Sequence, residues 1–158
     1  MTKNIYLDSC IFVAYFMKEK DKTGKLDQFF QEAKSSIDFV TSDWALTEVV
    51  KVLIKNKNIP PKKVAEHIQE LIRTKRVGDI KFNWIQVNKK ESYDFQEFFY
   101  EVQKVQLQYK GSLGDAIHAV IMKNNSIKTI LTTDPEFDGI KGMIVINLLD
   151  KKEGEPIC

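Results

Sequence analysis

The chain has 158 residues, of which 43% are hydrophobic and 29% are charged, and its formal net charge is +2. These values suit one domain with a single buried core, spanning residues 1–158, and they exclude a disordered chain. The two cysteines lie far apart without metal-ligand spacing, which excludes a disulfide framework and a thiolate zinc site.

Apolar runs and capping residues predict the elements of the N-terminal half. Residues 5–7 form a short apolar run that predicts a buried strand ending at Asp8. No apolar run before Asp8 is long enough for a signal peptide, and no stretch is long enough to span a bilayer, so we expect a cytoplasmic protein. The next predicted elements are helices at 9–16 and 22–35, a strand at 37–41, and a helix from Asp43 towards Lys55 that Ser42 caps.

The C-terminal half continues the alternation of strands and helices. Its predicted elements are a helix beginning at Pro60 and Pro61, a strand at 80–87, a long helix at 92–109, a helix capped by Ser112, and short strands at 129–131 and 143–146. Because strands and helices alternate, we expect a three-layer α/β fold with a central parallel sheet flanked by helices.

Four acidic residues occupy positions that this fold would bring to one edge of the sheet. Asp8 and Asp134 each end an apolar strand, Asp115 begins a helix, and Glu48 lies on an otherwise apolar helix face. Ligands bind at the carboxyl ends of parallel strands, so we expect these side chains to converge there. Taken singly, each residue can also be a turn former or a helix cap, and only the combination points to a site.

Converging carboxylates repel one another and require a cation. A ligand set made only of oxygen atoms favours Mg²⁺ or Mn²⁺, and such a site suits hydrolysis of a phosphodiester by in-line displacement. If metal ions neutralise four of the 22 acidic residues, 18 remain against 24 Lys and Arg, which leaves the surface at +6. A positive surface suits a polyanionic substrate.

Four segments resemble, in order, the signature blocks of PIN domains, and most closely those of VapC-type toxins. The segments are IYLDSCIFVAY at 5–15, SDWALTEVV at 42–50, GDAIHAV at 114–120 and LTTDPEF at 131–137. Each block is weak alone, but four in the right order cover nearly the whole chain.

The resemblance implies that Asp8, Glu48, Asp115 and Asp134 are catalytic and hold Mg²⁺ or Mn²⁺. It implies polar support from Ser9 and Thr132, and Cys10 stands where a small polar residue is common in relatives. Asp138 is interpreted either as an auxiliary metal ligand or, more simply, as a turn former.

The resemblance also implies a function, namely that of a metal-dependent endoribonuclease that hydrolyses RNA. Such a protein would be the toxin of a type II toxin–antitoxin pair, a homodimer held inactive by a small antitoxin. Two alternatives remain open: a housekeeping PIN nuclease in RNA processing or decay, and a non-catalytic PIN-like binding module.

Other residues have simpler interpretations that we favour. His118 lies one turn after Asp115 and is either a general base or a core histidine, and we favour the core histidine. The candidates for phosphate contact, each by default part of a solvated face, are Lys62, Lys63, Arg73, Lys75, Arg76, Lys89 and Lys90. The aromatic residues predicted to lie in the core or a dimer interface are Trp44, Trp84, Phe95, Phe98, Phe99 and Tyr100.

Overall fold

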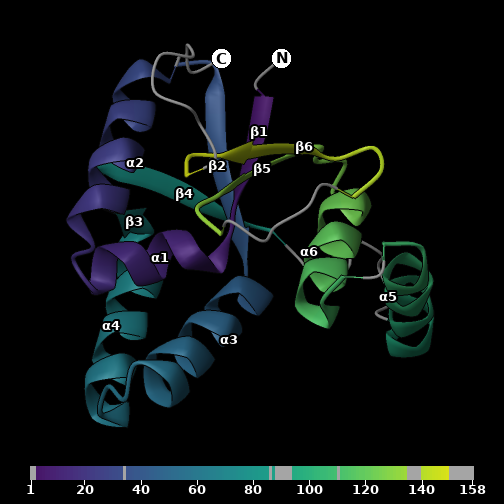
Figure 1. Cartoon of the computed structure of the whole chain (residues 1–158), viewed down its shortest axis with the longest axis horizontal. Coiled ribbons are helices and arrows are strands. Elements are labelled where there is room, and N and C mark those ends of the chain that lie inside the picture. The colour runs from purple at the N-terminus through teal and green to yellow at the C-terminus, as the bar shows by residue number, and fades with distance from the viewer. Residues whose placement is uncertain are drawn as a thin grey trace.

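A computed structural model describes residues 3–33, 35–85, 87, 94–109, 111–134 and 140–149. Within these ranges a six-stranded sheet lies between two layers of helices (Figure 1). Its strands, in spatial order, are β3 (Arg76–Val77), β4 (Ile80–Ile85), β2 (Ile37–Ser42), β1 (Lys3–Leu7), β5 (Thr129–Thr132) and β6 (Ile144–Asn147). All pair in parallel except β3, which is antiparallel to β4. The expected α/β fold with a central parallel sheet is confirmed, with β3 as an unpredicted addition.

The helices follow the predicted capping signals. Ser42 and Ser112 accept hydrogen bonds from Ala45 N and Asp115 N and so cap the helices that follow them. None of the described helices is long and apolar enough to cross a membrane. The α-helices in these ranges are α1 (Ser9–Phe16), α2 (Lys20–Glu32), α3 (Asp43–Lys51), α4 (Pro61–Thr74), α5 (Phe95–Tyr109) and α6 (Leu113–Asn124).

Helix α3 continues directly into a π-helical turn at Val52–Asn56. The sequence predicted one α-helix towards Lys55, so the prediction has the right extent but misses the change in helix type. Residues 88–93 and 135–139 lie outside the described ranges, which leaves Lys89, Lys90 and Asp138 without a structural outcome.

The core divides into two layers because side chains alternate across each strand. Ile5 and Leu7 of β1 point to the face covered by α1, α2, α3 and α4, whereas Tyr6 points to the face covered by α5 and α6. Figure 1 shows the same division, with α5 and α6 on the right and the other helices on the left. Both faces of the sheet are therefore buried, as is usual for parallel sheets.

The carboxyl ends of three adjacent strands define the edge at which the site lies. Strand β1 pairs with β2 on one side and with β5 on the other. Asp8 follows β1 directly, α3 begins immediately after β2, and Thr133 and Asp134 follow β5. Segments more than one hundred residues apart in the chain thus meet at one edge.

Candidate active site

Asp8 is a buried carboxylate, 5% exposed, at the junction of β1 and α1. Its Oδ1 accepts a hydrogen bond from the Ser9 backbone N–H at 2.7 Å, and its Oδ2 accepts one from Thr132 Oγ1 at 2.8 Å. Both residues that the resemblance assigned to polar support therefore contact this acid. These two hydrogen bonds hold both oxygens of the Asp8 carboxylate in place.

Cys10 supplies a further donor to Asp8. Its Sγ lies 3.3 Å from Asp8 Oδ2 and accepts a hydrogen bond from the Thr133 backbone N–H at 3.2 Å. Burial, reinforced by the negative charge of Asp8, raises the pKa of the Cys10 thiol well above its usual range. The thiol therefore stays protonated and can donate to Asp8.

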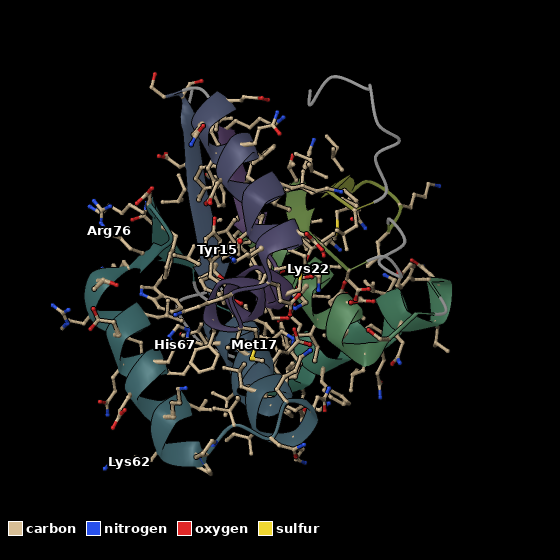
Figure 2. The ribbon with its side chains drawn as sticks, turned by 60° about the vertical axis from the view of Figure 1, so that its left-hand side comes forward. Tyr15, Met17, Lys22, Lys62, His67 and Arg76 are labelled. Atoms are coloured by element: carbon tan, nitrogen blue, oxygen red, sulfur yellow. The ribbon has the colours of Figure 1, made fainter. Side chains whose placement is uncertain are left out.

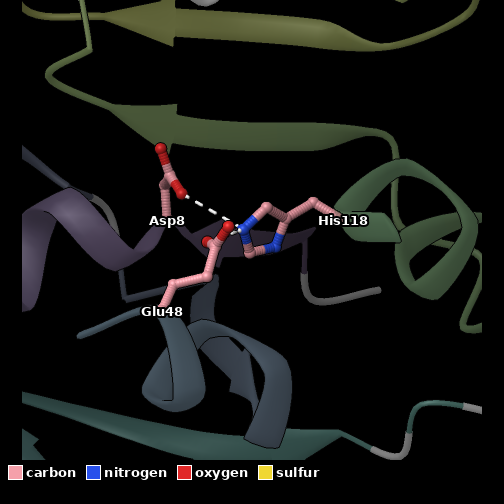
Figure 3. Close-up of side chains that lie close together, drawn as sticks. All are labelled: Asp8, Glu48 and His118. Atoms are coloured by element: carbon pink, nitrogen blue, oxygen red, sulfur yellow. Dashed lines mark hydrogen bonds and ion pairs between the residues drawn. The ribbon is translucent and has the colours of Figure 1, made fainter. Parts of the chain in front are cut away.

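Glu48 and His118 complete a tight cluster with Asp8 (Figure 3). The half-buried Glu48 extends from α3, and its Oε2 accepts a hydrogen bond from His118 Nε2 at 2.5 Å. The same nitrogen lies 3.5 Å from Asp8 Oδ1. One ligand atom from each of the three residues lies within 4.8 Å of the others.

His118 is buried as a core histidine should be, but its ring also belongs to the site. Tyr6 Oη lies 2.8 Å from His118 Nδ1 and 2.6 Å from Ser42 Oγ, so a chain of polar contacts links the cap of α3 to Glu48. Burial alone lowers the pKa of His118, but the hydrogen bond to Glu48 and the charge of Asp8 outweigh burial and raise it. The imidazole is thus placed to carry positive charge between two carboxylates.

Asp115 and Asp134 line the same pocket as Asp8 and Glu48. The volume of this pocket is about 410 Å³. Burial raises the pKa of Asp115, and the negative charges of Asp8 and Asp134 add to this effect. All four acids expected at the site therefore border one pocket. In the described ranges, however, the 4.8 Å group contains only two of them, Asp8 and Glu48, together with His118.

A larger cavity, about 660 Å³, lies where the C-terminal parts of α5 and α6 meet residues 126–128 and 140–143, and it contains none of these acids. It lies near the end of α6, where Met122 and Lys123 line it, whereas Asp115 lies in the first turn of that helix. The described residues that line it include no Asp or Glu, so the acidic chemistry belongs to the smaller pocket.

Thr132 connects two of the acids, and its removal is a test of the support role. Its buried Oγ1 donates to Asp8 Oδ2 and accepts from the Asp134 backbone N–H at 3.0 Å. We expect Thr132→Val to lower the free energy of unfolding by about 2 kcal/mol, because buried polar groups lose their partner. Mn²⁺ affinity, measured by calorimetric titration, should fall by about tenfold or more, because the hydrogen bonds that orient the ligands are lost.

Thr41 offers a matched control for this substitution. It is equally buried, and its Oγ1 donates to the Leu7 carbonyl at 3.1 Å without contacting an acid. Thr41→Val should cost about 1 kcal/mol of stability and leave Mn²⁺ affinity unchanged. Equal losses of Mn²⁺ affinity in both variants would contradict a specific support role for Thr132.

The pocket fits a divalent cation by its donor set. The Asp8 and Glu48 carboxylates offer oxygen ligands within 4.8 Å of each other, and Asp115 and Asp134 border the same pocket. The buried Thr133 Oγ1 has no hydrogen-bond partner in the described part of the chain, and Thr133 lines the same pocket. Such an orphan hydroxyl in a polar pocket is suited to a metal-bound water or a substrate oxygen.

A comparison with family models identifies the fold. The model of the PIN domain matches residues 5–143, most of the chain. The chain belongs to the PIN domain family. The resemblance that its four sequence blocks indicated is thereby confirmed, whereas a comparison with curated proteins finds no match for this PIN domain.

Solved structures of toxin–antitoxin proteins share the fold of this PIN domain. A toxin–antitoxin complex from Klebsiella pneumoniae has a TM-score of 0.54 at 16% identity, covering 91% of this chain and 97% of that one. VapC20 from Mycobacterium tuberculosis, a Sarcin-Ricin loop cleaving toxin, has a TM-score of 0.57 at 13% identity, with coverages of 84% and 91%. VapBC2 from Rickettsia felis, bound to a promoter DNA fragment, has a TM-score of 0.59 at 12% identity, with coverages of 91% and 98%.

Proposed function

We propose that this PIN domain is a metal-dependent endoribonuclease whose acids hold Mg²⁺ or Mn²⁺. The observation that carries the proposal is the cluster of Asp8, Glu48 and His118 at the carboxyl edge of the sheet. Asp115 and Asp134 border the same pocket and supply the remaining carboxylates. Four acids in one pocket repel one another, and hard divalent ions that would offset this repulsion prefer carboxylate oxygens.

The chain's own residues prepare this chemistry by fixing the carboxylates before substrate arrives. Ser9, Cys10 and Thr132 hold Asp8, while His118 holds Glu48 by one of its oxygens. Gly114 leaves room for the other Glu48 oxygen, because a Cβ at this position would lie 2.5 Å from it. A divalent ion bound between these groups would activate a water and neutralise charge on the reacting phosphate.

We further propose that the protein is the toxin of a toxin–antitoxin pair. Two of the similar structures are complexes or pairs of this kind, and a third is named as a Sarcin-Ricin loop cleaving toxin. The proposal includes a homodimer and a small antitoxin that covers the acidic pocket. Light scattering of the purified chain, alone and with the product of a neighbouring short gene, tests both partners.

The nuclease proposal is tested by metal removal and return. Purified protein is incubated with single-stranded RNA after treatment with EDTA, and then with Mn²⁺ or Mg²⁺ added in excess. We expect no cleavage in EDTA, full cleavage on addition of metal, and a saturable heat of Mn²⁺ binding by calorimetry. Cleavage that persists in EDTA, or a protein that gives no heat with Mn²⁺, would contradict the proposal.

A further inference from the structure

The pocket that contains the acids has a second wall that is basic and polar. Lys51, Asn56 and Lys57 line it at the end of α3 and in the π-helical turn that follows. We call these three residues the lysine ledge. The ledge and the acids belong to one continuous pocket, because Glu48 lies one turn before Lys51 on the same helix.

The π-helical turn is what brings Lys57 to this wall. The Lys57 backbone N–H donates to the Val52 carbonyl at 3.0 Å, a bond that spans five residues. In an α-helix, residues five apart point about 140° away from each other, since each residue turns the helix by about 100°. The wider turn instead brings Lys57 back beside Val52, and both residues line the pocket. Such single π turns often mark functional sites.

The two lysines of the ledge carry charges that nothing in the described part of the chain neutralises. Lys22 also lines the pocket, but its Nζ pairs with Glu19 at 2.6 Å. Lys51 and Lys57 are exposed and have no ion-pair partner among the described residues. The pocket therefore offers two available cations in addition to the carboxylates.

We propose that the lysine ledge binds the RNA backbone next to the phosphate that is cut. The inference rests on the proposed nuclease function, because a strand whose reacting phosphate lies at the acids must leave the pocket along one of its walls. Lys51 and Lys57 would contact neighbouring phosphates, and the Asn56 amide would hydrogen bond to phosphate or sugar oxygens. The ledge thus sets the path of the strand rather than its sequence preference.

The test removes the two ledge charges and compares the result with removal of two others. The ledge variant is Lys51→Gln/Lys57→Gln, and its control is Lys55→Gln/Lys62→Gln. Both double variants lower the net charge by two. In the control, Lys55 lies in the π-helical turn and Lys62 lies on α4. Neither Lys55 nor Lys62 lines the pocket. Figure 2 shows Lys62 at the lower end of α4, well apart from the pocket residue Lys22.

Binding of a fluorescein-labelled single-stranded RNA is measured by anisotropy over a range of salt concentrations, with Ca²⁺ in place of Mn²⁺. For wild type, the logarithm of affinity should fall linearly with the logarithm of salt concentration. We expect this slope to become shallower by about 1.4 in the ledge variant, since each phosphate contact on a single strand contributes about 0.7. The control variant should keep the wild-type slope. In Mn²⁺, the ledge variant should raise KM at least about fivefold and change kcat less than twofold.

Each outcome separates this inference from the nuclease proposal. If wild type binds Mn²⁺ and cleaves RNA, but the ledge and control variants have the same slope, the ledge inference is wrong and the nuclease proposal stands. An unchanged slope in the ledge variant would indicate that Lys51 and Lys57 bind another partner, such as an acidic protein segment. If wild type neither binds Mn²⁺ nor cleaves, yet only the ledge variant has a shallower slope, RNA binding stands and the nuclease proposal fails. A wild type that binds no RNA would overturn both.

Discussion

Asp8→Asn is expected to abolish metal-dependent cleavage while the fold survives. Asparagine has the size of aspartate and can keep the hydrogen bond from the Ser9 backbone, so the β1–α1 junction has no reason to rearrange. The substitution removes one negative charge from the cluster with Glu48 and His118. Loss of an outer-shell partner of a metal ligand costs up to about a hundredfold in affinity or activity, and we expect loss of this proposed ligand to cost more.

The measurement combines RNA cleavage in Mn²⁺ with thermal unfolding in EDTA. The melting temperature of the metal-free variant should change by less than about 5 °C, and Mn²⁺ should no longer raise it. Asp21→Asn is the matched control, because Asp21 is exposed in the first turn of α2 and does not line the pocket. Full Mn²⁺-dependent activity of purified Asp8→Asn would refute the role proposed for this residue.

The convergence of the acids was predictable from sequence because it follows from topology. Asp8 and Asp134 each follow an apolar strand, and the carboxyl ends of neighbouring parallel strands meet at one edge whatever the details of packing. The positions of Glu48 and Asp115 follow from where their helices begin, which the caps Ser42 and Ser112 mark, respectively. These inferences need only the order of elements and the period of each.

The role of His118 was not predictable by the same reasoning. Its neighbours on α6 are almost all buried, so periodicity favours a core position, and that part of the interpretation agrees with the structure. Whether its Nε2 reaches Glu48, seventy residues away, depends on how α3 and α6 pack against the sheet. One signal was present: Tyr6 lies in a buried strand, and a buried tyrosine hydroxyl needs a polar partner.

The π-helical turn and β3 escaped prediction for a related reason. The turn at Val52–Asn56 keeps the fully buried Leu53 in the core. The same apolar pattern is therefore compatible with a π-helical turn and with an α-helix. Strand β3 has two residues and exists only because it pairs with β4. Local periodicity specifies neither the π-helical turn nor β3, yet the π-helical turn places Lys57 on the pocket wall.

A series of polar contacts both positions the Glu48 carboxylate and places a positive charge beside it. Ser42, Tyr6, His118 and Glu48 form consecutive contacts that begin at the N-terminal cap of α3 and return to the same helix. These contacts hold the Glu48 carboxylate at its Oε2, while the His118 imidazole offsets the negative charges of Asp8 and Glu48. A protein that must keep Asp8 and Glu48 close together before any ion arrives requires such a cationic neighbour.

His118→Leu should therefore destabilise the metal-free protein strongly and the metal-bound protein less. Without the imidazole, Asp8 and Glu48 face each other with no cation between them, and loss of one partner from a buried charge pair costs about 3 kcal/mol or more. For a chain of this size the melting temperature in EDTA should fall by about 10 °C. Mn²⁺ should raise the melting temperature of this variant by more than that of wild type, because the dication then supplies the missing charge.

His67→Leu is the matched control, since it removes the chain's other histidine. His67 packs edge-on against Phe16 with ring centroids 4.5 Å apart, its Nε2 has no hydrogen-bond partner in the described ranges, and burial lowers its pKa. Leucine there removes an unsatisfied polar atom, so stability should be unchanged or higher, with the same Mn²⁺ effect as in wild type. If Mn²⁺ stabilised His118→Leu less than wild type, the imidazole would be a metal ligand rather than the counter-charge that holds the two carboxylates together.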